Sequence, residues 1–143
     1  MKRLVFLLPL AVAFWLVSNG VSESGSVYLS PTTVRIADCY VPPCTATACP
    51  PCNRPVTLYN TTTSRITIQS ESIVGSGGFS ILSNGCGSSL AANSSCELVV
   101  QFDPSCCGTG EFTGTFYVYD TASNSPQTAS LIAIVYCTDP VTC

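Results

Sequence analysis

The chain has 143 residues, which is enough for one domain and too few for two large ones. Only 9% of the residues are charged, the formal net charge is −3, and there is no histidine. Without histidine the chain lacks the commonest general base and metal ligand, and a histidine-based acyl-transfer triad is excluded. The shortage of charge leaves serine, threonine, asparagine and glutamine to form the polar surface, as is usual for extracellular proteins.

The first 22 residues have the pattern of a secretory signal peptide. Lys2 and Arg3 supply the positive start, an apolar run covers Leu4 to Val17, and the small polar segment Ser18 to Ser22 suits a cleavage region. The apolar run is about 14 residues long, which is shorter than the roughly 20 needed to span a bilayer. We therefore expect a signal peptide over residues 1–22, a mature domain over 23–143 with no membrane insertion, and a secreted or cell-surface protein.

Loss of the signal leaves a mature chain with very few basic residues. Arg35, Arg54 and Arg65 remain, there is no lysine after Lys2, and all eight acidic residues lie beyond the signal. Nucleic-acid phosphates require a basic patch, so no nucleic-acid partner is expected. The single carboxylates are scattered and form no obvious facing pair of the kind that glycosidases use.

Short alternating segments separated by turn residues run through the mature chain, which is typical of a β-sandwich or barrel. The last two segments, residues 112–119 and 131–136, are expected to form a hairpin across the polar loop 120–127. No segment outside the signal shows a helical period. The other predicted strands centre on Val27–Leu29, Val34–Ile36, Val56–Tyr59, Ile66–Gln69, Phe79–Ile81 and Leu98–Phe102.

Two stretches break the alternation. The segment Cys39 to Pro55 contains four cysteines and several prolines, and it is expected to be an irregular loop held by its own disulfides. The segment Ser83 to Ser95 is rich in glycine, serine and asparagine, and it is expected to be a loop closed by a bridge between Cys86 and Cys96.

From about Val27 to Tyr136 the chain resembles the choice-of-anchor D domain, a relative of the ASPM-SPD-2-Hydin (ASH) immunoglobulin-like domains. The motifs that carry the resemblance occur in family order. They are Ser30-Pro31, Val56-Thr57-Leu58-Tyr59-Asn60-Thr61, Phe79-Ser80-Ile81, Cys86-Gly87, Ser89-Leu90, Cys96-Glu97-Leu98-Val99-Val100-Gln101-Phe102-Asp103-Pro104, and a following glycine at Gly108 or Gly110.

The resemblance implies an all-β, immunoglobulin-like antiparallel sandwich of about seven to eight strands, here reinforced by disulfides. It also implies a module without catalytic residues, and it matches a Cys86–Cys96 pair. The chain departs from the family pattern at the insert 39–55, at the doublet Cys106-Cys107 and in the tail ending at Cys143. The resemblance therefore carries the fold and not the functions of larger family members.

All ten cysteines follow the signal, and an even number in an exported chain indicates a disulfide framework. Adjacent cysteines strain a mutual bridge, so Cys143 is expected to bond one of Cys106 and Cys107, and Cys137 the other or Cys39. The full set is Cys39, Cys44, Cys49, Cys52, Cys86, Cys96, Cys106, Cys107, Cys137 and Cys143.

The Cys49-Pro50-Pro51-Cys52 motif has the C-x-x-C spacing of redox proteins, and with Cys39 and Cys44 it would supply four sulfurs for zinc. The following Asn53-Arg54-Pro55 leads into a strand rather than a helix, and export favours bridges. Structural disulfides are therefore the preferred interpretation, with no metal and no cofactor expected.

Asn60 and Asn93 each begin an N-x-Ser/Thr triplet and are candidate glycosylation sites. Tyr117 and Tyr119 share one face of their predicted strand. That face is either an exposed adhesive surface or is buried under a neighbouring strand.

We expect a secreted structural or adhesive immunoglobulin-like module and not an enzyme, with a fibre subunit as one form. Its protein partner would include further copies of itself, joined when the N-terminal segment Val27, Tyr28 and Leu29 adds to a neighbour's open sheet edge. The alternative is a soluble protein- or glycan-binding module. A metal or redox protein using the Cys39 to Cys52 cluster ranks third.

Overall fold

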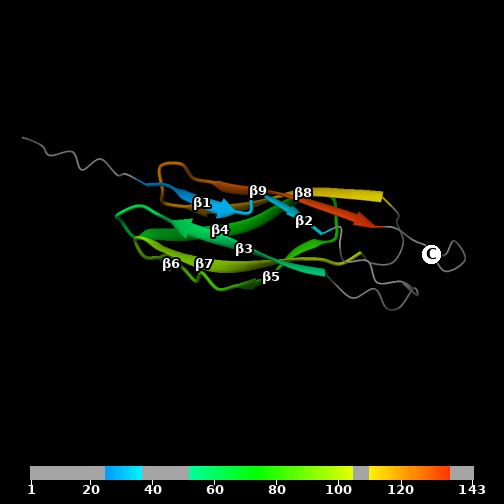
Figure 1. The fold of residues 1–143 in the computed structure, drawn as a ribbon, viewed down its shortest axis with the longest axis horizontal. Helices are drawn as coiled ribbons and strands as arrows, with labels where there is room; N and C mark the ends of the chain where they lie inside the picture. Colours follow the sequence, from blue (N-terminus) through cyan, green and yellow to red (C-terminus); the bar gives the residue numbers. More distant parts are fainter. Residues whose placement is uncertain (1–24, 37–51, 105–109, 136–143) are drawn as a thin grey trace, which may run out of the picture.

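The computed structural model describes residues 25–36, 52–104 and 110–135, and these residues form nine strands and no helix. The strands are β1 (Val27–Ser30), β2 (Thr33–Arg35), β3 (Cys52–Asn60), β4 (Ile66–Gly75), β5 (Phe79–Asn84), β6 (Ser89–Leu90), β7 (Ser94–Phe102), β8 (Gly110–Asp120) and β9 (Gln127–Val135). They build a four-stranded sheet in the order β1-β3-β7-β5 and a five-stranded sheet in the order β2-β9-β8-β4-β6 (Figure 1). The predicted all-β, immunoglobulin-like sandwich is confirmed.

The core lies between the two sheets and follows from the alternation in the sequence. Successive side chains of a strand point to opposite faces, so every second residue of β3 and β7 turns inward. From the other sheet, β8 contributes Phe116 and Val118, and β9 contributes Leu131; all three are fully buried. The buried hydrophobic residues of β3 and β7 are Val56, Leu58, Leu98, Val100 and Phe102.

Along one side of the sandwich, the N-terminal segment passes from one sheet to the other and connects them. β1 pairs antiparallel with β3 in the four-stranded sheet, and after Ser30-Pro31-Thr32 the chain pairs as β2, parallel to β9, in the five-stranded sheet. The Asn124 amide nitrogen donates to the backbone oxygen of Val27 at 2.7 Å, which joins the β8–β9 turn to β1.

The predicted C-terminal hairpin is confirmed. β8 and β9 pair antiparallel from Gly110 opposite Val135 to Val118 opposite Gln127. β9 has β2 on its other side over Ser130–Ile132, so it is central there, as its nearly continuous apolar sequence predicts.

Two sequence predictions are corrected. The irregular segment was expected to run to Pro55, but β3 begins at Cys52 and pairs with β7 from its first residue. Pro55 fits this strand because β1 covers only Thr57–Asn60, so β3 has no described neighbour beside Pro55 on that side. The predicted loop Ser83 to Ser95 contains the short strand β6, which pairs with the start of β4.

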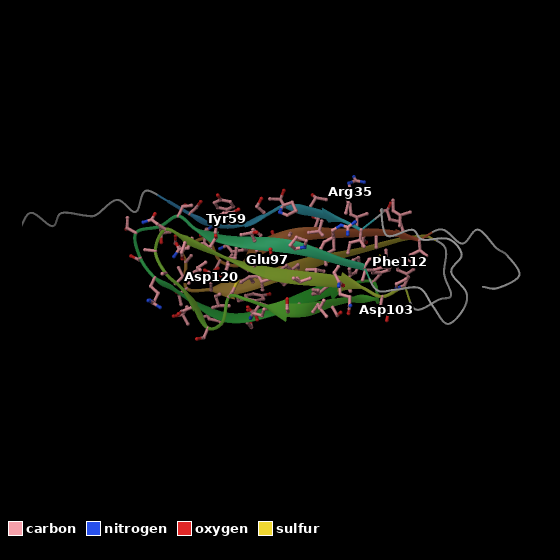
Figure 2. The ribbon with its side chains drawn as sticks, turned by 60° about the horizontal axis from the view of Figure 1, so that its bottom comes forward. Arg35, Tyr59, Glu97, Asp103, Phe112 and Asp120 are labelled. Carbon is pink, nitrogen blue, oxygen red and sulfur yellow. A yellow bond between two sulfur atoms is a disulfide. The ribbon has the colours of Figure 1, made fainter. Side chains whose placement is uncertain are left out.

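The two ends of the sandwich differ. At one end lie the β3–β4 and β8–β9 turns, and Asp120 marks that end in Figure 2. At the other end lie Phe112 and Asp103 (Figure 2), where Phe102 packs against Phe79 and Phe112 with ring centroids 4.8 and 5.3 Å apart. None of the described segments is a helix of the length and hydropathy that crossing a bilayer requires.

Candidate interaction surfaces

Each sheet presents a stacked tyrosine pair on its outer face. Tyr28 of β1 lies directly opposite Tyr59 of β3, and their ring centroids are 5.2 Å apart. On the five-stranded sheet, Tyr117 and Tyr119 of β8 stack with centroids 6.0 Å apart. Tyrosine combines a large apolar ring with a polar tip, and it is enriched at protein interfaces for that reason.

The outer face of β8 is exposed, which resolves the two interpretations left open by the sequence. Tyr119 is exposed, Tyr117 is half-buried, and no described strand lies over them. The neighbouring outward side chains on β8 and β9 are mainly hydroxyl groups, so this face carries little charge. They are Thr113, Thr115, Thr128 and Ser130.

The side opposite the β1–β2 closure has open strand edges. β5 pairs with β7 and with no other described strand. β4 pairs with β6 only at Ile66 and Thr67, so beyond the irregularity between Ile68 and Ser70 it has β8 on one side and no described strand on the other. The two most exposed aliphatic side chains among the described residues, Val74 on β4 and Leu82 on β5, lie on these edge strands.

The predicted strand-donor segment is part of the domain's own core. Val27 and Leu29 are 0% and 2% exposed, whereas Tyr28 between them is 42% exposed. Just before β1, the Ser26 backbone amide donates to the Thr61 hydroxyl at 2.9 Å, and this hydroxyl donates to the Ser26 backbone oxygen at 2.8 Å. If β1 left its own domain, the core that Val27 and Leu29 now fill would be exposed. A donated β1 would therefore have to be replaced by the β1 of another copy.

Asn60 is a structural residue, which corrects one of the two glycosylation predictions. Its side chain is 0% exposed, and its amide nitrogen donates to the backbone oxygens of Ser64, Leu90 and Ala91. Its side-chain oxygen accepts from the backbone and hydroxyl of Thr62. A glycan on this nitrogen is incompatible with the folded domain. Asn93 is exposed at a turn with φ 50°, and it stays a candidate acceptor.

A second buried polar network holds the β8–β9 turn. Asp120 is 5% exposed; one of its carboxylate oxygens accepts from the Ala122 amide at 2.7 Å and the other from the Gln127 side chain at 3.2 Å. The Ser125 hydroxyl accepts from the Asp120 amide at 2.9 Å. No buried side-chain polar atom of the described residues lacks a partner, so the buried polar groups of both turns are satisfied.

A pocket of about 250 Å³ lies between these two turns. Arg65 supplies its positive charge, and the Arg65 guanidinium donates to the Ser89 hydroxyl at 3.1 Å. Sequence reasoning missed this site, because nothing in the local sequence distinguishes Arg65 from Arg35 or Arg54. The lining comprises Gly25, Thr62, Ser64, Arg65, Ile66, Thr121, Ala122, Ser123 and Asn124.

The predicted bridge between Cys86 and Cys96 is confirmed, with an S–S distance of 2.02 Å. Cys52 is also disulfide-bonded, so its sulfur is not a free thiolate for redox chemistry or metal binding. No described group of three histidine, cysteine or carboxylate side chains is arranged to hold a metal ion. The predicted pairings of the other seven cysteines lie outside the described residues: Cys39, Cys44, Cys49, Cys106, Cys107, Cys137 and Cys143.

Comparison with known proteins shows the fold and no closer relationship. No family model matches the sequence, and no curated protein matches it. Among solved structures, the ASH/PapD-like domain of human CEP192 matches 92% of this chain and 100% of its own length, with TM-score 0.56 and 10% identity. The periplasmic chaperone SfaE matches 80% of this chain and 60% of its own, with TM-score 0.53 and 14% identity.

A third similar structure is the VesB protease of Vibrio cholerae, with TM-score 0.56 and 16% identity over 78% of this chain. The match covers 32% of VesB, so this chain spans less than two thirds of that protein, as is also the case for SfaE. At these identities the likeness concerns the fold alone. The resemblance read from the sequence therefore holds at the level of an immunoglobulin-like, PapD-like sandwich, and no enzymatic activity follows from it.

Proposed function

We propose that this protein is a secreted structural or adhesive module, stabilised by disulfides, that acts by binding other proteins, including copies of itself. The observation that carries the proposal is the pair of open strand edges on a sandwich whose outer faces display exposed tyrosines. Backbone groups along an open edge pair with an added strand, and this is a common mode of protein recognition.

Three further features support this proposal. The residues 1–22 have the signal-peptide pattern, the Cys86–Cys96 bridge is of the kind that persists in oxidising compartments, and one similar structure is a periplasmic chaperone. In the fibre form of the proposal, β1 of one copy replaces β1 of the next. The short length of β1 and its position at a sheet edge favour this exchange, and the burial of Val27 and Leu29 gives the incoming strand its specificity.

The test uses the mature chain, secreted by an oxidising host with its disulfides intact. Analytical ultracentrifugation and electron microscopy should detect assembly or a stable complex with a surface protein of the source cell. In non-permeabilised cells, an antibody should label the protein from outside. Retention of the chain in the cytosol with reduced cysteines would falsify the proposal.

The pocket between the two turns favours the second candidate, a glycan-binding module. It combines one arginine with several hydroxyl groups between two hydrogen-bonded turns, and such groups hydrogen-bond to sugars. Binding on a glycan array that Arg65→Ala abolishes would support this function. An array without signal, beside a confirmed protein complex, would remove it.

A further inference from the structure

The open edge of β4 has a regular hydrogen-bonding pattern. The Ser76 amide donates to the backbone oxygen of Thr113 on β8 at 2.9 Å, which places this residue pair among those that bond across the β4–β8 ladder. Bonded and non-bonded pairs alternate in an antiparallel ladder. Ser70, Ser72 and Val74 therefore bond towards β8, and the intervening residues Glu71, Ile73 and Gly75 direct their backbone groups to the open edge.

This edge is complementary to itself. In an antiparallel pair centred on Ile73, Ile73 faces Ile73 of a second copy, and Glu71 faces Gly75. Each of these pairs exchanges two backbone hydrogen bonds. The arrangement keeps the two Glu71 carboxylates apart and sets each beside a residue without a side chain. Glu71 also accepts a hydrogen bond from the Asn84 amide at 2.9 Å, so its side chain is already held.

Side chains on the outer face add to this complementarity. In the same register Val74 faces Ser72 of the second copy, and Val74 is the most exposed large hydrophobic residue described, at 63%. The segment from Gln69 to Gly75 contains one charge and neither lysine nor proline, which are the residues that commonly block edge pairing. Leu82, half exposed on β5, lies on the same open side.

We propose that the β4 edge is a homodimer interface, in which two copies pair antiparallel about a two-fold axis at Ile73. The two five-stranded sheets then form one continuous sheet, and the tyrosine-bearing outer faces of both copies point the same way. The interface adds a second contact to the proposed function and is independent of β1 exchange.

The experiment measures self-association of the mature, disulfide-intact chain by sedimentation velocity over a concentration series. Ser72→Lys with Val74→Lys places lysines opposite each other across the interface, and we expect it to weaken dimerisation at least tenfold. The matched control is Thr128→Lys with Ser130→Lys, which adds equal charge to the same outer face on β9, away from the open edge. The control should dimerise like the unmodified chain.

Hydrogen exchange of the unmodified chain gives a second readout. Protection of the Glu71, Ile73 and Gly75 amides should rise with protein concentration, while the amides of Ser70, Ser72 and Val74 should be protected throughout. A chain that remains monomeric at about 1 mM, where even weak association would be detected, overturns the interface. Equal weakening by both lysine pairs also overturns it. Assembly that survives Ser72→Lys with Val74→Lys refutes this interface and leaves the proposed function standing.

Discussion

Asn60 and Ala91 are 31 positions apart in the sequence, yet the Asn60 amide nitrogen donates to the Ala91 backbone oxygen at 2.9 Å. With its bonds to Ser64 and Leu90, Asn60 also joins the end of β3 to the β3–β4 turn and to the end of β6. This one side chain satisfies backbone groups in two separate parts of the chain besides its own strand.

Replacing Asn60 with alanine should therefore destabilise the domain by about 2–3 kcal/mol, because three buried or partly buried backbone acceptors lose their donor. Chemical denaturation of the disulfide-intact protein measures this loss. Asn93→Gly is the control: the position has positive φ, which glycine adopts freely, and stability should change by less than about 0.5 kcal/mol. Equal effects from the two substitutions would contradict the structural role of Asn60.

Because inward and outward residues alternate along β1, truncating Leu29 should destabilise the domain much more than truncating its neighbour Tyr28. Leu29→Ala should cost about 2–5 kcal/mol, since it leaves a cavity in the core. Tyr28→Ala should cost less than Leu29→Ala, since it removes the stack on Tyr59, worth about 0.5–1.5 kcal/mol, and the burial of a side chain that is 42% exposed. Thermal and denaturant unfolding provide both values. If Tyr28→Ala proved the more damaging, the inward direction of Leu29 would be wrong.

The Cys86–Cys96 bridge closes a short loop of sequence separation 10. Replacing both cysteines with alanine should lower the free energy of unfolding by about 2–3 kcal/mol through the greater entropy of the unfolded chain. Non-reducing peptide mapping should find these two cysteines linked only to each other. A peptide joining either of them to another cysteine would contradict the structure.

Asp120→Asn should destabilise the β8–β9 turn by about 1–3 kcal/mol, because the new amide would meet the amide of Gln127, which now donates to the carboxylate. Hydrogen exchange should show the loss as faster exchange at Ala122, whose amide donates to Asp120. Glu97→Gln on an exposed position of β7 is the matched control and should leave both quantities unchanged. Unaltered exchange at Ala122 in Asp120→Asn would count against the network.

Sequence alternation predicted most strands, and the structure buries alternating apolar residues such as Leu58 and Val100, because the face on which a residue lies depends only on the local period. The alternation could not predict which distant segments pair with each other. The strand β6 is two residues long in a glycine- and serine-rich stretch, and it forms only because β4 lies beside it. The burial of Asn60 within a glycosylation triplet depends on partners that no local pattern identifies. The same holds for the β4 edge, which no described strand covers beyond Thr67.

The parallel pairing of β2 with β9 has a mechanical consequence. β1 begins at one end of the sandwich and β9 finishes at the other (Figure 1), so tension applied before β1 and after β9 pulls β2 and β9 in opposite directions along their length. The bonds from Ser130 to Thr32 and from Ile36 to Ile132, at 2.9 and 2.8 Å, are then loaded together in shear instead of opening one after another. A domain connected in this way unfolds slowly under tension. Its resistance to stretching depends on the rate of forced unfolding and not on its equilibrium stability.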